Sequence, residues 1–326
     1  METLMSNMWI VAAIMLVGLV LLVKSADWLV DGASALAKRF GISDLVIGLT
    51  VVAFGTSMPE FVVNMVSVAD GVTDLALTNI LGSNIINTYV ILGVTALIYP
   101  IATQKRTRDF DLPLGIIAGL AVIMISVISP KLGMPDGINR WGGVVLLVIF
   151  VIFMHLTMRH AKDHTDELET STYASMPLWR AIILILVGLI GLVVGGEMIV
   201  KSAVKIAVQL GVSDAIIGLT IVALGTSLPE LATSAVAAFK KNSDIAIGNV
   251  AGSNIFNVFF VLGMSATIRP LPDYDNMMLD SVMVALGSML VWLFVKISHK
   301  RELNRWGGVL LLIVYGAYLA YRLTHV

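Results

Sequence analysis

The sequence predicts an all-α membrane protein of ten transmembrane helices, arranged as two inverted five-helix repeats with broken helices at the core. Three observations lead to this prediction. The chain of 326 residues is 58% hydrophobic and only 13% charged, about half the charged share of an average soluble domain. A segment of its first half recurs in its second half. Both copies carry a proline and a glutamate inside an apolar run, where a helix is expected to break.

Ten apolar runs are long enough to cross a bilayer, which takes about 20 residues. We expect spans near residues 8–38, 43–69, 74–98, 110–129, 140–158, 178–208, 213–239, 244–268, 277–296 and 306–322. The first is interpreted as an uncleaved span, because no basic segment or small-residue cleavage site accompanies it. The polar segment 159–177 is interpreted as a cytoplasmic linker between an N-terminal repeat (1–158) and a C-terminal repeat (178–326).

The Lys and Arg residues predict the orientation, because cytoplasmic connections are enriched in them. With the N-terminus outside, 15 of the 21 Lys and Arg residues fall at or near cytoplasmic connections and 6 fall on the outer side. The sequence therefore predicts a multi-pass protein of the cell membrane, inner or plasma, with both termini outside.

The internal repeat gives an independent reason for this topology. Residues 41–101 align with 211–271 at a constant offset of 170 without gaps, and 28 of the 61 positions are identical. The pentapeptide Asn-Arg-Trp-Gly-Gly also occurs twice, at 139–143 and 304–308. Since each half holds five spans, the second half enters the membrane upside down relative to the first. Secondary transporters use such inverted repeats, with the site near the midplane where the repeats meet.

The first repeated motif is Gly-Thr-Ser-hydrophobic-Pro-Glu, at 55–60 and 225–230. Its glutamates, Glu60 and Glu230, lie within apolar spans, where a charge costs about 3 kcal/mol or more and usually marks an ion or substrate path. Each proline leaves the carbonyl four residues earlier without a helical donor. Irregular backbone at membrane depth is tolerated where it lines a cavity. We therefore expect carbonyls to face a cavity at Ala53, Gly55, Thr56, Ala223, Gly225 and Thr226.

The second repeated motif is Gly-Ser-Asn-x-x-Asn, at 82–87 and 252–257. Ser83 and Asn87 are four residues apart, so a helix presents both on one face. Asn84 is about 100° away around the helix and is expected to face a neighbouring helix. In an inverted repeat the faces of both copies converge on one pocket. Polar residues at helix starts, such as Asp44 with Ser43 as its alternative, and also Asp244, are expected to act as N-caps.

Charge limits what such a pocket holds. Two carboxylates in one pocket cannot both stay ionised unless a cation lies between them. Carbonyl, hydroxyl and carboxylate oxygens suit hard cations such as Ca²⁺ and Na⁺. One Ca²⁺, two Na⁺ or two protons would neutralise the pair, and occupants that exclude one another are the basis of coupled exchange. A channel would need weaker, open binding along a pore.

Other classes find no support in the sequence. It contains no His-Glu-x-x-His, no Gly-x-Ser-x-Gly and no nucleotide-binding loop, so no enzyme is predicted. The absence of cysteine excludes disulfides and thiolate metal sites. No cofactor, nucleic-acid partner or protein partner is expected. The expected partners are the transported ions and the lipid bilayer.

The paired motifs resemble the two alpha-repeats of the cation/Ca²⁺ exchanger superfamily, particularly the prokaryotic Na⁺/Ca²⁺ exchangers, and the resemblance covers the whole chain. It implies a secondary antiporter that exchanges Na⁺ for Ca²⁺ by alternating access. It implies a central Ca²⁺ site made by Glu60, Glu230 and the carbonyls of Thr56 and Thr226. It also implies flanking Na⁺ sites, with Asn87 and Asn257 at the middle position and the remaining ligands from Ser57, Ser83, Ala53, Ser227, Ser253 and Ala223.

Two departures from related patterns bear on the driving ion. Some exchangers carry Asp where this chain has Asn257, so K⁺ co-transport is not expected. The proton/Ca²⁺ branch typically shows Gly-Asn-x-x-Glu in place of Gly-Thr-Ser-x-Pro-Glu, which favours Na⁺ here. A Ca²⁺/H⁺ antiporter on the same fold is the alternative, followed by a cation channel. The long first and sixth spans are expected to slide against a core built on spans 2–3 and 7–8.

Overall fold

The computed structural model describes residues 8–134, 136–163, 176–211 and 223–324, which are helical apart from two short strands and one isolated bridge. Elements named η are π-helical. The first half consists of α1 (Met8–Phe40), α2 (Asp44–Ile47), η2 (Gly48–Val52), α3 (Ala53–Thr56), α4 (Met58–Asp70), α5 (Thr73–Ile85), η3 (Ile86–Ile91), α6 (Leu92–Ile98), β1 (Ile101–Ala102), η4 (Thr107–Asp111), α7 (Leu112–Lys131) and α8 (Arg140–Asp163). The second half consists of α9 (Leu178–Gln209), α11 (Ala223–Thr226), α12 (Leu228–Phe239), α13 (Ser243–Ile255), η8 (Phe256–Leu262), α14 (Gly263–Ile268), α15 (Met277–Ile297), β2 (Glu302–Leu303) and α16 (Arg305–Thr324).

The helices of the described residues account for nine of the predicted spans. Eight are long and apolar enough to cross a membrane, and the segment from Asp44 to Asp70, bent by 45° at its break, makes a ninth. The predicted span 213–239 lies partly outside the described residues, and its remainder forms α11 and α12. The count of ten therefore stays a prediction. The predicted linker also lies largely outside the described residues, although α8 continues into it as far as Asp163.

The helix break falls where the repeated motif predicts it. In the first half the chain leaves helical geometry at Ser57 (φ −85°, ψ 7°) and resumes with Pro59 in the first turn of α4. Proline is tolerated there because the first turn has no helical acceptor for its missing N–H. In the second half Ser227 (φ −88°, ψ 5°) and Pro229 repeat this geometry between α11 and α12. Two similar sequences therefore give two matching breaks.

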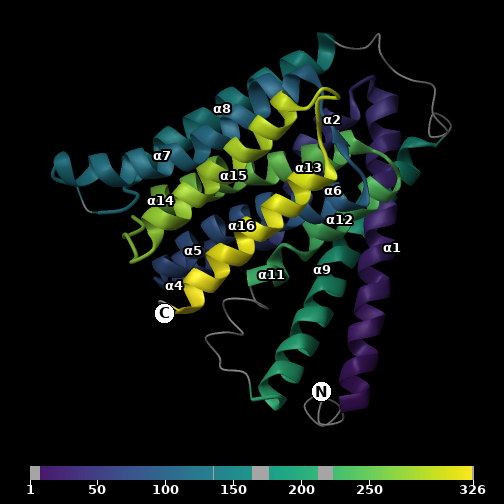
Figure 1. Ribbon diagram of the computed structural model, residues 1–326, viewed down its shortest axis with the longest axis horizontal. Coiled ribbons are helices and arrows are strands. Elements are labelled where there is room, and N and C mark those ends of the chain that lie inside the picture. Colours follow the sequence, from purple (N-terminus) through teal and green to yellow (C-terminus); the bar gives the residue numbers. More distant parts are fainter. Residues whose placement is uncertain (1–7, 135, 164–175, 212–222, 325–326) are drawn as a thin grey trace.

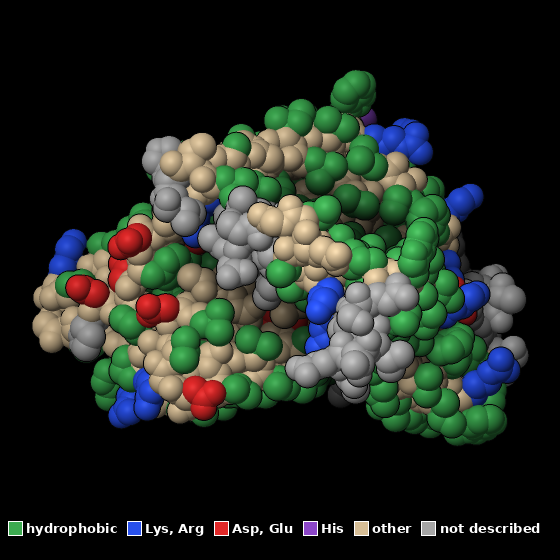
Figure 2. Space-filling model, turned by 90° about the horizontal axis from the view of Figure 1, so that it is seen from below, with side chains coloured by type: hydrophobic (Ala, Val, Ile, Leu, Met, Phe, Trp, Pro, Cys, Tyr) green, Lys and Arg blue, Asp and Glu red, His purple; other side chains and the backbone are tan. Residues whose placement is uncertain are grey.

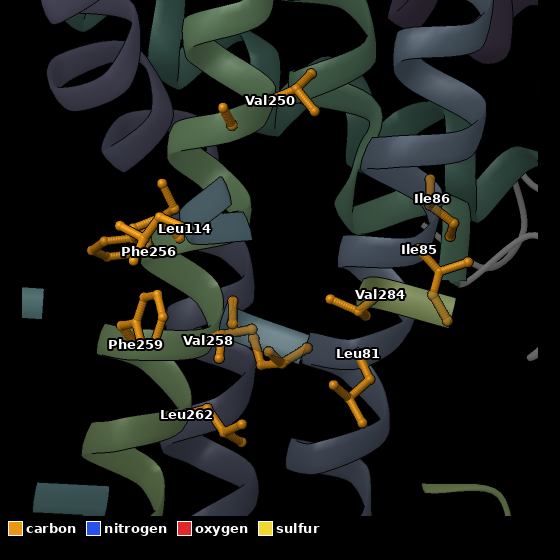
Figure 3. Close-up of a cluster of buried hydrophobic side chains, with 14 of the residues drawn as sticks. Leu81, Ile85, Ile86, Leu114, Val250, Phe256, Val258, Phe259, Leu262 and Val284 are labelled. Atoms are coloured by element: carbon orange, nitrogen blue, oxygen red, sulfur yellow. The ribbon is translucent and has the colours of Figure 1, made fainter. Parts of the chain in front are cut away.

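The two Gly-Ser-Asn motifs lie on long bent helices at the centre of the molecule. Each begins as an α-helix, α5 or α13, and changes to π-helical turns after Ile85 or Ile255. π-Helical turns inside α-helices frequently occur at functional sites. One hydrophobic cluster surrounds these helices, and Figure 3 shows side chains of both, among them Leu81 and Val258, together with Val284 of α15.

Helices α1 and α9 form a separate long pair that lies along one side of the molecule (Figure 1). Their backbones approach closely: a Cβ added at Gly195 would lie 2.9 Å from the carbonyl oxygen of Gly18. One added at Gly188 would lie 2.9 Å from the carbonyl oxygen of Ser25. Small residues permit this packing of membrane helices. At 33 residues, α1 is about 50 Å long, which exceeds the thickness of the hydrocarbon layer.

The outer surface is apolar, as a bilayer requires. Large hydrophobic side chains such as Leu16, Val20, Leu186 and Ile190 are exposed on α1 and α9. Figure 2 shows hydrophobic side chains over much of one face, with the charged groups scattered among them. Trp141 and Trp306, at the starts of α8 and α16, are exposed, and tryptophan is enriched at membrane interfaces. The molecule is therefore a multi-pass membrane protein.

Two short backbone ties connect the halves. Strands β1 and β2 pair in antiparallel fashion, with Ile101 opposite Leu303. An isolated antiparallel bridge joins Ile138 to Leu271, with N···O distances of 2.8 and 2.9 Å. Ile101 and Leu271 are equivalent in the repeat, and Ile138 and Leu303 each precede the pentapeptide Asn-Arg-Trp-Gly-Gly. The same tie is therefore made twice, each time with one strand from each half.

Candidate cation-binding site

The two glutamates of the repeated motif lie in equivalent positions. Glu60 is the third residue of α4 and Glu230 the third residue of α12, and both side chains are fully buried. The first turn of a helix favours a negative charge, because its free N–H groups point toward it. Hydrogen bonds of Ser57 and Ser83 connect the surroundings of the two carboxylates. The structure thus brings the two acidic groups into one region of the core.

Around these carboxylates, serine hydroxyls make hydrogen bonds between the two halves of the chain. Ser57 Oγ, in the first half, donates to Glu230 Oε1 at 2.9 Å. Ser83 Oγ donates to Glu60 Oε1 at 3.3 Å and lies 3.2 Å from Ser227 Oγ of the second half. Each carboxylate is therefore linked, directly or through one serine, to the opposite repeat.

Ser253 is the second serine that contacts Glu230. Its hydroxyl lies 3.4 Å from Glu230 Oε1 and 3.5 Å from the carbonyl oxygen of Ala53. Asn257 Nδ2 donates to Ser83 Oγ at 3.3 Å. These contacts gather most of the predicted ligands in one place. Ala223 is the first residue of α11, and its side chain lies outside the described residues.

Several buried atoms of the two repeated motifs have no hydrogen-bond partner among the described residues. They are Glu60 Oε2, Glu230 Oε2, Asn257 Oδ1, Thr226 Oγ1 and both polar atoms of the Asn87 side chain. Because most buried polar groups have a partner, these unpartnered atoms make the two motifs a candidate site for a polar or charged ligand. All but one of these atoms are oxygens, the ligands that hard cations prefer.

The charge of the pocket is not balanced by a basic side chain. Within the described residues, every ion pair of 4.0 Å or less involves carboxylates other than Glu60 and Glu230. The described residues also contain no group of three or more His, Cys, Asp or Glu side chains suited to a metal. The pocket therefore combines two carboxyl groups with neutral oxygens, and a cation between them would relieve the repulsion that arises when both are ionised.

Some residues of the two motifs bond to neighbouring helices rather than to the glutamates, although Asn84 Oδ1 also accepts from Asn257 Nδ2 at 3.1 Å. The amide of Asn84 donates to the carbonyl oxygen of Asn254 at 3.0 Å, and that of Asn254 donates to Thr88 Oγ1 at 2.7 Å. Both asparagines thus cross-link helices, as predicted for Asn84. The hydroxyl of Thr56 donates to the carbonyl of Ala53 at 3.3 Å and to Asn249 Oδ1 at 3.1 Å.

Asn249 is a residue that the sequence reasoning missed. It is fully buried in α13 and accepts from Thr56 Oγ1, while its Nδ2 donates to the carbonyl oxygen of Glu230 at 3.3 Å and to Ser234 Oγ at 3.0 Å. It therefore fixes both broken helices relative to each other. Asn249 and its equivalent Asn79 are identical within the aligned repeat, and this identity was the available signal.

Replacement of Asn249 by alanine is expected to weaken the pocket while leaving its carboxylates in place. It removes the contacts of Asn249 with Thr56, Ser234 and Glu230, at about 1–3 kcal/mol for each group that is left buried and unsatisfied. Thr56 keeps its bond to the carbonyl oxygen of Ala53. We expect the Ca²⁺ concentration for half-maximal uptake to rise roughly tenfold. Asn79→Ala is the matched control, because Asn79 Nδ2 bonds to Asn64 Oδ1, at 2.8 Å, and Asn79, unlike Asn249, makes no bond to a glutamate within the described residues. Equal effects of the two substitutions would contradict this role.

Together the fold and the pocket define a class: a multi-pass membrane transporter of cations. Comparison with known proteins gives the family. The model of the family described as sodium/calcium exchanger protein matches residues 10–159 and 180–324. The chain therefore belongs to the sodium/calcium exchanger family, whose members are transporters rather than enzymes, and it is a cation/Ca²⁺ antiporter.

Individual relatives cover nearly the whole chain. The putative antiporter CaxA of Alkalimonas amylolytica is 38% identical over 317 residues, which are 95% of this chain and 98% of that protein. The sodium/calcium exchanger MaX1 of Methanosarcina acetivorans is 32% identical over 341 aligned positions, covering 94% and 96%. Among solved structures, the sodium-calcium exchanger NCX_Mj soaked with Na⁺ and Sr²⁺ superposes with a TM-score of 0.81 at 34% identity, covering 96% of this chain and 99% of the other.

Proposed function

We propose that this protein exchanges Na⁺ for Ca²⁺ across the cell membrane by alternating access, with Glu60 and Glu230 holding both ions in turn in one shared midplane site. The observation that carries the proposal is the buried pair of carboxylates, each with one oxygen unpartnered among the described residues and each tied to hydroxyls that link both halves. One Ca²⁺ or two Na⁺ neutralise the same two charges, so the two ions compete for the site.

The remaining ligands complete an oxygen shell around that centre. We assign the central Ca²⁺ to the glutamates with the carbonyls of Thr56 and Thr226. Flanking Na⁺ ions use the hydroxyls and carbonyls beside them, and Asn87 and Asn257 lie at the middle position. The contacts of Ser57, Ser83, Ser227 and Ser253 with the carboxylates or with one another support this assignment.

The proposal includes ten spans in two inverted repeats, with both termini outside. Contacts between the connections support this topology. Four connections predicted to be cytoplasmic meet in one polar recess, which is lined by residues that include Lys38, Ala102, Lys241 and Lys300. The bridge between Ile138 and Leu271 joins two connections predicted to lie outside.

Na⁺ rather than H⁺ is the proposed driving ion. The sequence carries Gly-Thr-Ser-x-Pro-Glu in both halves. The relative MaX1 is named a sodium/calcium exchanger, and the similar NCX_Mj structures were soaked with Na⁺ and with Ca²⁺ or Sr²⁺. Protons are the second candidate, because a carboxylate without a basic partner binds them readily in an apolar core.

Uptake of ⁴⁵Ca²⁺ into proteoliposomes tests the coupling. With Na⁺ inside, no Na⁺ outside and the membrane potential clamped by K⁺ and valinomycin, we expect uptake that requires the Na⁺ gradient. Liposomes loaded with K⁺ in place of Na⁺ are the control. Uptake driven equally well by a proton gradient alone would favour Ca²⁺/H⁺ exchange, and uptake that needs no counter-ion would indicate a channel.

A further inference from the structure

An ion-pair cluster ties α1 to the end of α12. Lys240 directly follows α12, and its Nζ lies 2.6 Å from Asp27 Oδ1 and 2.6 Å from Asp31 Oδ1. It also donates to the carbonyl oxygen of Asp27 at 3.2 Å. Burial by itself would lower the pKa of Lys240, but the two aspartates raise it above its ordinary value, so the amine stays charged. The cluster joins α1, of the long α1–α9 pair, to the end of the helix that carries Glu230.

The internal repeat defines equivalents for all three residues. The offset of 170 extends through α1 and α9, where Leu-Val-Gly-Leu occurs at 16–19 and at 186–189. The equivalents of Asp27, Asp31 and Lys240 are, in that order, Glu197, Lys201 and Asp70. The pair Asp31–Lys240 thus corresponds to Lys201–Asp70, in which both charges are reversed. A double reversal preserves the attraction between the two positions.

The structure forms the first of these pairs and not the second. Lys201 bonds instead to Glu197 of its own helix, at 2.5 Å, and the two side chains are 66% and 58% exposed. Asp70, the exposed last residue of α4, makes no ion pair within the described part of the chain. The packing differs in the same way: α1 packs along α12, whereas the equivalent helices α9 and α4 are not packed against each other.

Lys201 can change its partner at little cost. Its side chain is 66% exposed, and it lies eight residues before the end of α9, or about 12 Å along the axis. The exposed pair that Lys201 makes with Glu197 is worth no more than about 1 kcal/mol, so exchanging it for another carboxylate costs little.

We propose that Asp31–Lys240 and Lys201–Asp70 are alternative ion pairs that hold the α1–α9 pair at the two ends of its movement. The first pair closes the end of the molecule at which Lys240 lies, as in this structure. When the α1–α9 pair moves, that pair breaks, the other forms, and the opposite end closes. This inference depends on the proposed alternating access, and it assigns the four residues as gates rather than ion ligands.

Cysteine cross-linking tests the exchange, because the native chain contains no cysteine. In the variant Asp31→Cys/Lys240→Cys a short cross-linker should join the two positions readily, and in Asp70→Cys/Lys201→Cys it should do so only while Na⁺ and Ca²⁺ are being exchanged. Both cross-links, detected as joined peptides by mass spectrometry, should block Ca²⁺ uptake until they are reduced. The four single-cysteine variants are the controls. Absence of the 70–201 cross-link during exchange would overturn the proposal.

Charge reversal gives a second test without cross-linking. Lys201→Asp or Asp70→Lys places like charges at the proposed contact, so the Ca²⁺ exchange rate should fall roughly threefold, and the double variant should restore it. Lys205→Asp, one turn further along α9, is the matched control and should leave the rate unchanged. The ion-pair exchange would be contradicted if the single variants exchanged Ca²⁺ at the native rate. It would also be contradicted if the double variant exchanged Ca²⁺ no faster than either single variant. Na⁺-dependent uptake by the native chain tests the proposed function separately.

Discussion

Replacement of Glu60 or Glu230 by glutamine is expected to abolish Ca²⁺ transport while the protein still inserts and folds. Glutamine keeps the size of the side chain and its bonds to serine hydroxyls, but it removes one of the two charges of the pocket. Loss of one partner of a buried charge pair costs about 3 kcal/mol or more, which is roughly 100-fold in affinity. Each single variant should therefore show no uptake above empty liposomes.

Thermal stability separates a loss of binding from a loss of folding. A ligand that binds only the folded state raises its stability, so Ca²⁺ should raise the Tm of the native chain and leave that of both glutamine variants unchanged. Without added ions, the variants should be at least as stable as the native chain, because two like charges no longer face each other. Glu302→Gln, in strand β2, is the matched control. Native transport by either glutamine variant would refute the shared site.

Replacement of Asp280 by asparagine is expected to produce the largest loss of stability among conservative changes outside the pocket. The buried carboxylate of Asp280 accepts from Arg322 Nη1 at 2.7 and 2.8 Å, from Tyr274 at 2.6 Å and from Tyr318 at 2.8 Å. These bonds tie α16 to α15. Asparagine leaves Arg322, whose side chain is 13% exposed, without its counter-charge, at about 3 kcal/mol or more.

The Tm in detergent measures this effect. A loss of about 3 kcal/mol corresponds to a fall of roughly 6–12 °C. Asp273→Asn is the control, because Asp273 is exposed and bonds only to the backbone N–H of Tyr274. The pair of substitutions Asp280→Asn and Arg322→Met should recover most of the loss, since neither charge is then left alone. Equal Tm values for Asp280→Asn and Asp273→Asn would contradict this account.

Sequence reasoning succeeded where local chemistry decides the structure. A run of apolar residues has to be a helix in lipid, so the spans follow from length and hydropathy. A proline inside such a run has to interrupt its hydrogen bonds, so the breaks at Ser57 and Ser227 follow as well. The equivalent positions of Glu60 and Glu230, each the third residue of its helix, also follow from the repeat.

The N-cap predictions were correct for the alternative Ser43 but wrong for Asp44 and Asp244, because neighbouring elements compete for the same side chains. Ser43 caps α2 by accepting from the N–H of Val46 at 3.3 Å, while Asp44 accepts from Asn242 at 2.6 Å. Asn242, rather than Asp244, caps α13. The carboxylates of Asp44 and Asp244 do not cap their own helices. The local sequence does not reveal which groups of other helices compete for such side chains.

Tertiary contacts also explain the residues that no pattern indicated. Asp280 and Arg322 are 42 positions apart, and no periodicity connects them. The bond between Thr56 and Asn249 spans 193 positions. Such pairs depend on how whole helices pack, whereas the repeated motifs could be recognised from their own residues.

The two backbone ties have a consequence for how the protein is made. Ile101 can pair with Leu303 only after residue 303 has left the ribosome. Ile138 can pair with Leu271 only after residue 271 has done so. The first half is inserted early, but its two backbone pairings cannot form until their partners in the second half have been synthesised. Hydroxyls such as that of Ser57 likewise have to wait for Glu230. The ion pocket is thus assembled late in biosynthesis, so a truncated or stalled chain carries at most half of it.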